Sequence, residues 1–347
     1  MADVPPASSK ARPPRILIGV LLALPLGGCV GGDDEDGADG DDSAAETEGG
    51  TGDLPSPYAD SDGSGGDVPS MGADEAMTAS LAGLGTLSEL RPMEVFDAFE
   101  TMFEPEEGCP AEIEVYEEEA TVTTWYVEGS CTTSSGLTIR GGGTYERLSR
   151  EEDGVTIEVR GLSAEDGTLR LETGDGRYFE LSGYAFHESV RGDGGNYGES
   201  YLEFNASIRA DEQTAGSSAL MDPSLDLQVG VFAVSEGPVK AFGGSGSIAG
   251  PGLGEALAFS FSQTAVISAL CPEEPSGTFS VRDDAGFWHD IVFDAYVLGD
   301  EADEEPEVDE ALCDDCGNYL AGGTPDGQAC VDASVLADLL DWEVTPW

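Results

Sequence analysis

The chain has very little positive charge. Of its 347 residues only 14 are lysine or arginine, against 70 aspartates and glutamates, and the formal net charge at pH 7 is −56. A surface this acidic repels the phosphate backbone of nucleic acids and the headgroups of anionic lipids. The composition therefore argues against nucleic-acid binding and favours divalent cations or basic molecules as partners.

Histidine is just as scarce, because His187 and His289 are the only two in the chain. A Ser-His-Asp triad could be drawn through His289 and Asp290, but neighbouring residues of a strand point to opposite faces. The chain has no G-x-S-x-G motif, and we expect the glycine-rich segment 243–247 to form a turn. We therefore predict no catalytic residue, although a pair of carboxylates brought together in space stays open.

Long hydrophobic runs are missing as well. The apolar stretch at residues 16–26 is too short to span a bilayer. It follows three basic residues, Lys10, Arg12 and Arg15, and a basic leader before a short apolar core is typical of a signal peptide. We predict that this signal peptide comprises residues 1–28.

The end of the signal peptide and the residue after it read Leu26-Gly27-Gly28-Cys29, which resembles the lipobox of bacterial lipoproteins. The resemblance implies cleavage before Cys29 and attachment of acyl chains to that cysteine, which anchor the protein in a membrane. Val30 follows in place of the aspartate that retains many such proteins in the inner membrane. The resemblance therefore implies a lipid anchor in the outer membrane, on its periplasmic face or at the cell surface.

The segment behind the anchor, residues 29–78, is rich in aspartate and glutamate, has no lysine or arginine, and has few large apolar side chains. Such a segment cannot bury enough apolar surface to offset its chain entropy. We predict an acidic disordered tether that holds the rest of the chain away from the membrane.

One helix and many strands are expected beyond the tether. Apolar residues recur at three-to-four spacing over 81–103, which predicts a helix. Apolar and polar residues then alternate, as in 201–208, and this pattern is typical of half-buried strands. We predict an all-β fold, an antiparallel meander, sandwich or open barrel, with a short N-terminal helix.

Asp-Gly pairs begin at residues 153, 166 and 175, at intervals that predict hairpin turns. We divide the body into a β-rich domain at 79–270, with its leading helix, and a small cysteine-containing unit at 271–347. The second unit is expected to contain a β-hairpin and a short helix.

The cysteines predict disulfides. Apart from Cys29, six remain, an even number in an exported chain. These candidates are Cys109, Cys131, Cys271, Cys313, Cys316 and Cys330. Proximity in sequence favours a bond between the first two. It also favours a bond from Cys271 to either Cys313 or Cys316, with Cys330 bonded to the other one.

Eight carboxylates crowd the segment 300–310, where a hard cation would relieve their repulsion. The candidate metal ligands are Asp300, Asp303, Glu305 and Asp309, with calcium as the ion, and a solvated acidic loop is the alternative. We predict no other cofactor.

These features together predict a lipid-anchored cell-envelope protein of binding or structural type, whose partners are the membrane and an unidentified envelope protein or ligand. Two alternatives are a β-barrel-like carrier of a lipid or other hydrophobic ligand, and a secreted-type hydrolase that uses paired carboxylates. A continuous apolar cavity would favour the carrier, whereas a filled core would favour the structural or adhesive type.

Overall fold

A computed structural model gives the fold. The described residues are 69–89, 92–110, 112–117, 120–152, 154–192, 197–215, 226–250, 253, 256–271, 274–297, 307–308, 313–331 and 336. The predicted signal peptide, Cys29, most of the predicted tether and most of the predicted C-terminal helix lie outside these residues.

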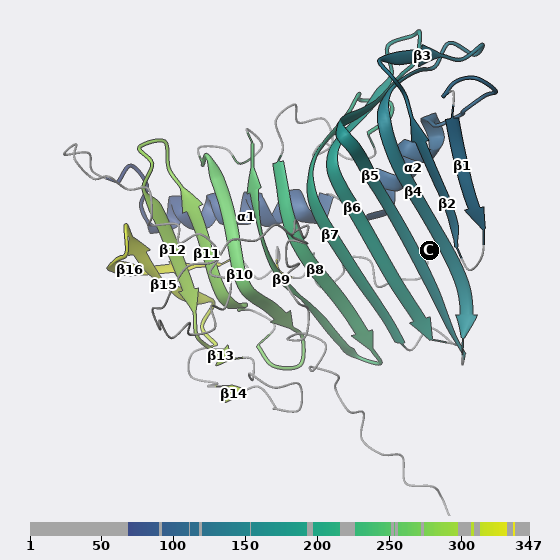
Figure 1. The fold of residues 1–347 in the computed structure, drawn as a ribbon. Coiled ribbons are helices and arrows are strands. Elements are labelled where there is room, and N and C mark those ends of the chain that lie inside the picture. Colours follow the sequence, from purple (N-terminus) through teal and green to yellow (C-terminus); the bar gives the residue numbers. More distant parts are fainter. Residues whose placement is uncertain are drawn as a thin grey trace, which may run out of the picture.

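The body is one 14-stranded antiparallel sheet, a meander in which the strands follow one another in chain order except that β3 pairs with β4 alone (Figure 1). Its strands are β1 (Glu112–Glu117), β2 (Thr121–Tyr126), β3 (Ser130–Thr132), β4 (Thr138–Glu152), β5 (Val155–Glu172), β6 (Tyr178–Gly192), β7 (Tyr197–Ala210), β8 (Asp226–Glu236), β9 (Val239–Ala249), β10 (Ala258–Ile267), β11 (Ser276–Arg282), β12 (Trp288–Phe293), β15 (Cys316–Ala321) and β16 (Thr324–Cys330). A separate short pair joins β13 (Tyr296–Val297) to β14 (Glu307–Val308). The all-β prediction is confirmed, in its meander form.

Two helices, α1 (Ala73–Glu89) and α2 (Pro92–Met102), lie behind the strands in Figure 1. We call the sheet face that they cover the helix face and the opposite one the outer face. The helical prediction over 81–103 missed the start of α1. There the Gly72 amide donates to Glu75 Oε2 (2.9 Å), and the acidic residues of the first turn suit the positive end of the helix dipole.

Aromatic side chains fill the space between the helices and the sheet. Phe99 of α2 stacks on Trp125, with ring centroids 5.7 Å apart, and meets Phe179 edge-on at 6.0 Å. On α1, a Cβ at Gly83 would lie 2.2 Å from the ring of Phe259, so glycine lets the helix approach the sheet. The helix face therefore carries a packed core.

A second, smaller core lies on the outer face. Its buried residues are Ala265, Ile267, Cys271, Ala295 and Tyr296. It sits beside β10, because Ala265 and Ile267 alternate with Val266, which belongs to the main core. Beyond this point the chain adds β11, β12, β15 and β16 to the same sheet, so the expected C-terminal unit is continuous with the body.

Of the four turns predicted from glycine-containing segments, two are found in the structure and two are not. Gly154 and Gly176 have positive φ (82° and 95°) in the β4–β5 and β5–β6 turns, as the hairpin prediction requires. Gly167 instead lies inside β5, at a register shift against β6, so the predicted turn there is wrong. The turn expected at 243–247 is also wrong. These residues lie within β9, where a Cβ at Gly244 would come within 2.1 Å of the Gly230 carbonyl oxygen.

Candidate binding surface on the outer face

One transverse row of the outer face consists of uncharged polar side chains on eight successive strands. Register pairs its members across β2 and β4 to β10. These residues, which we call the neutral row, are Thr124, Thr144, Ser163, Tyr184, Asn205, Gln228, Ser247 and Ser260. One residue in five of the whole chain is acidic, 70 of 347, yet none of these positions is.

The row is accessible at its centre. Asn205 and Gln228 are exposed and the other members are half-buried. The residues on either side of Asn205, Gln228 and Ser260 point into the main core, as Phe204 and Ala206 do beside Asn205. The centre of the row therefore offers amide donors and acceptors on the face that the helices leave uncovered.

The row has different neighbours at its two ends. At β1 the next residue is Glu114, which is exposed. At β11 and β12 the next residues are Ser280 and Asp290, both buried, and the Ser280 hydroxyl donates to Asp290 Oδ1 at 2.7 Å. The row thus has a carboxylate beyond each end, and within it Thr144 donates to Glu165 and Tyr184 donates to Glu203.

A cluster of aromatic rings surrounds Glu203 beside the row. The hydroxyls of Tyr184 and Tyr201 both donate to this carboxylate, the second at 3.0 Å, and the ring of Phe186 lies 6.2 Å from that of Tyr201. Burial, the hydrogen bond and the charge of Glu203 raise the pKa of Tyr184 to about 12, and the same causes raise the pKa of Tyr201. Both phenols therefore stay protonated and hold the carboxylate in place.

Two glycines flank this cluster without an evident backbone reason. Gly161 pairs with Phe186 on one side, and Gly230 pairs with Glu203 on the other. A Cβ at either position would meet no atom closer than 3.7 Å, and neither residue has positive φ. Because these glycines lack a side chain, nothing protrudes from the sheet beside the aromatic rings at these two positions.

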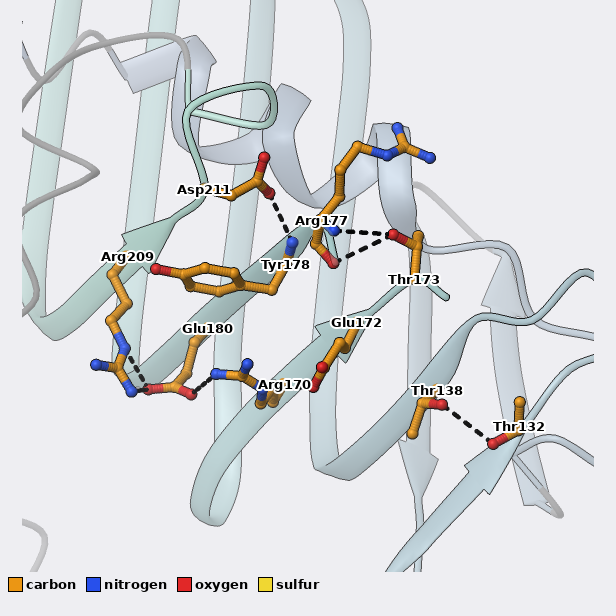
Figure 2. Close-up of polar contacts among 10 residues, drawn as sticks. All are labelled: Thr132, Thr138, Arg170, Glu172, Thr173, Arg177, Tyr178, Glu180, Arg209 and Asp211. Carbon is orange, nitrogen blue, oxygen red and sulfur yellow. Dashed lines mark hydrogen bonds and ion pairs between the residues drawn. The ribbon is translucent and has the colours of Figure 1, made fainter. Parts of the chain in front are cut away.

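An ion-pair ladder lies further along the same face (Figure 2). Glu180 accepts from Arg170 Nη1 and from Arg209 Nε, each at 2.7 Å, and so links β5, β6 and β7. The Arg170 guanidinium also lies 4.8 Å from the centre of the Tyr178 ring. The charged groups of this ladder pair with one another, and we assign the ladder to stabilising the sheet.

His187 belongs to the helix face and lies within β6. Its Nε2 lies 3.0 Å from Ser200 Oγ, and both residues are buried. Burial first, and then the charges of Arg160 and Arg191, lower the pKa of His187 to about 4. Arg160 itself pairs with Asp97 of α2 at 3.0 Å, so a neutral imidazole sits among groups that join helix and sheet.

His289 lies in a buried chain of hydrogen bonds. Its Nε2 contacts Asp283 Oδ2 at 3.0 Å, its Nδ1 contacts the Tyr319 hydroxyl at 2.8 Å, and that hydroxyl donates to the Met71 carbonyl at 3.0 Å. Asp290 is not part of it and bonds Ser280 instead, as the alternation of a strand predicts. Sequence reasoning missed Asp283 because the aspartate reaches His289 only across the β11–β12 turn.

The described cysteines form three disulfides, Cys109–Cys131, Cys271–Cys313 and Cys316–Cys330. These pairs lie within the set that sequence proximity favoured. The four predicted metal ligands at 300–309 fall outside the described residues. Among the residues that are described, no cluster of three or more histidine, cysteine or acidic side chains is placed to hold a metal ion.

Comparison with known proteins returns no match to a protein-family model, to a curated protein or to a solved structure. In the part of the chain that the structure describes, neither α1 nor α2 is long and apolar enough to cross a membrane.

Proposed function

We propose that this chain is a lipid-anchored binding protein of the cell envelope that presents the outer face of its sheet to a ligand. The difference between the two faces carries the proposal. The helix face is packed against α1 and α2, whereas the outer face exposes Asn205 and Gln228 in the middle of the neutral row. Three disulfides are consistent with an extracytoplasmic location.

The lipid anchor is the second part of the proposal and is supported by the lipobox at Cys29. The described body begins at residue 69, so the acidic segment between them leaves room for the domain to stand off the membrane. Replacing the anchor residue, Cys29→Ser, is expected to move the protein from the membrane fraction to the soluble fraction with an unchanged melting temperature. Continued membrane association of this variant would remove the anchor from the proposal.

The packed helix face favours binding over carriage of a hydrophobic molecule. Such a ligand would need an open apolar face of the sheet, and here Phe96, Phe99 and Leu84 of the two helices are fully buried in the core on the helix face. The ligand is therefore expected on the opposite face.

Protection of the outer face in native envelopes tests the proposal without knowledge of the ligand. We would place p-azidophenylalanine at position 205 in the row, and at position 175 in the exposed β5–β6 turn as the control, and label both with a strained alkyne. We expect position 205 to react in the purified protein but to be protected in intact envelopes, while position 175 reacts in both. Equal labelling of position 205 in the two preparations would overturn the proposal.

A further inference from the structure

The neutral row has the form of a linear site. Neighbouring strands of a sheet lie about 4.8 Å apart, so eight strands spread the row over about 34 Å. Each strand contributes one hydroxyl or amide at the same level, as the pairs Tyr184–Asn205 and Asn205–Gln228 illustrate. A ligand that follows the row would meet one polar side chain on each strand, two of which, Thr144 and Tyr184, already donate to carboxylates.

Charge restricts what such a ligand can be. The chain carries a net charge of −56, which repels phosphorylated, sulfated and carboxylated polymers. The side chains of the row carry no charge of their own, and the two carboxylates that touch it, Glu165 and Glu203, already accept hydrogen bonds from Thr144 and from two tyrosines. The hydroxyls and amides of the row both donate and accept hydrogen bonds. Those properties suit a partner that is uncharged and rich in hydroxyl groups.

The cluster around Glu203 adds a second, independent element. Aromatic rings such as Phe186 and Tyr201 can pack on the apolar C–H face of a sugar ring, while a fixed carboxylate accepts from its hydroxyls. Gly161 and Gly230 leave the surface low on either side, although a Cβ would fit at both positions. Glycine in the interior of a strand weakens that strand. Glycine at a position where the backbone does not require it therefore indicates space for a ligand.

We infer that the neutral row, with the rings beside Glu203, binds a linear uncharged polysaccharide; this deepens the proposed function and rests on it. Asn205 and Gln228 hydrogen-bond to the polymer at the centre of the row, and Phe186 and Tyr201 pack against one of its sugar rings.

Affinity electrophoresis tests the inference, because the large negative charge gives the full-length Cys29→Ser protein high mobility in a native gel. The gels contain soluble hydroxyethyl cellulose, galactomannan or xylan, with alginate as the anionic control. We expect retardation in at least one neutral polymer and none in alginate. Retardation that is as strong in alginate would contradict an uncharged ligand.

Variants then locate the site. The pair Asn205→Ala and Gln228→Ala, and separately the pair Gly161→Val and Gly230→Val, are each expected to weaken association at least tenfold with an unchanged fold. The matched control removes two hydroxyls elsewhere on the same face, Thr132→Ala with Thr138→Ala, and is expected to bind like the parent protein. Unchanged binding in the Asn205 and Gln228 variant would place the polymer elsewhere and overturn the inference.

The inference and the proposed function fail in different ways. If no neutral polymer retards the folded protein while position 205 is still protected in envelopes, the polysaccharide is wrong and the outer face binds another ligand. If that position is also unprotected, both fail.

Discussion

Ser70 donates two hydrogen bonds to Asp283, a residue 213 positions further along the chain. The Ser70 amide and hydroxyl both reach Asp283 Oδ2, at 2.8 and 2.9 Å. The carboxylate also contacts His289, and the Phe287 amide donates to its other oxygen. The residues that precede α1 are thereby fixed to the turn between β11 and β12.

Removing this carboxylate is expected to destabilise the body. Burial alone would raise the pKa of Asp283, but hydrogen bonds from the Ser70 amide, His289 and the Phe287 amide outweigh it and lower the pKa. Asp283→Asn should therefore cost about 2–3 kcal/mol in the free energy of unfolding, measured by urea denaturation. Asp284→Asn, which neutralises the exposed carboxylate that also accepts from the Ser70 hydroxyl, serves as the control with a loss below about 1 kcal/mol.

His187 predicts a loss of stability in weak acid. Its pKa is about 4 in the folded chain against 6.5 in the unfolded one, so only the unfolded chain takes up the proton between these values. Stability should fall as the pH is lowered from 6.5 towards 4, by up to about 3 kcal/mol. The measurement is the difference between the parent and His187→Gln across this range, and parallel profiles would contradict the burial of a neutral imidazole.

Glu274 is expected to have the opposite effect on the pH dependence of stability. This fully buried carboxyl has a pKa raised to about 7, chiefly by burial, although the amides of Asp314 and Ala295 oppose the shift. The folded chain therefore holds a proton that the unfolded chain, with a pKa near 4.5, has lost. The stability contribution is present below pH 4.5 and is lost as the pH rises through 7.

Glu274→Gln keeps the shape of the side chain and cannot ionise. At pH 8 we expect it to be more stable than the parent by about 1–2 kcal/mol, and at pH 4 the advantage should disappear. Thermal melts at the two pH values provide the measurement. A variant that is less stable at pH 8 would show that the ionised carboxylate is stabilised in the fold.

Glycines of the outer face predict contrasting effects of the same substitution. Gly161→Ala and Gly230→Ala should each raise stability by about 0.5–1 kcal/mol, because the added Cβ meets only ordinary contacts. Gly183→Ala is the comparison, since this residue has a φ of 93° and its Cβ would lie 2.0 Å from the Asn205 carbonyl oxygen. It should be strongly destabilising, and equal effects at the three positions would contradict the register.

Much of the fold could be predicted from the sequence because alternation is a local property. In β7 every second residue, from Gly198 to Ala210, is buried, and the alternation over 201–208 already showed this. The start of α1 could not be found in that way. Its first turns hold small and acidic residues, and their burial, as at Ala76 and Met77, depends on a sheet that the chain forms later.

The candidate site was beyond local reasoning for the same reason. Asn205 and Gln228 each look like one more polar residue of an alternating strand. They become members of a row only through the register of β7 on β8, which turns and bulges elsewhere determine. Asp283 and His289 were likewise joined by a hairpin turn and not by a spacing that the sequence displays.

The two terminal strands of the sheet, β1 and β16, bear on how copies of this protein behave together. The edge of an open sheet is a template on which another chain can add a strand, and charge, proline and irregular pairing are the means of blocking it. β1 carries glutamate at 112, 114 and 117, while β16 carries Pro325 and Asp326, and its register with β15 is irregular. The acidity of this chain thus has a use quite apart from any ligand, since charge on both terminal strands opposes the addition of a strand from another copy.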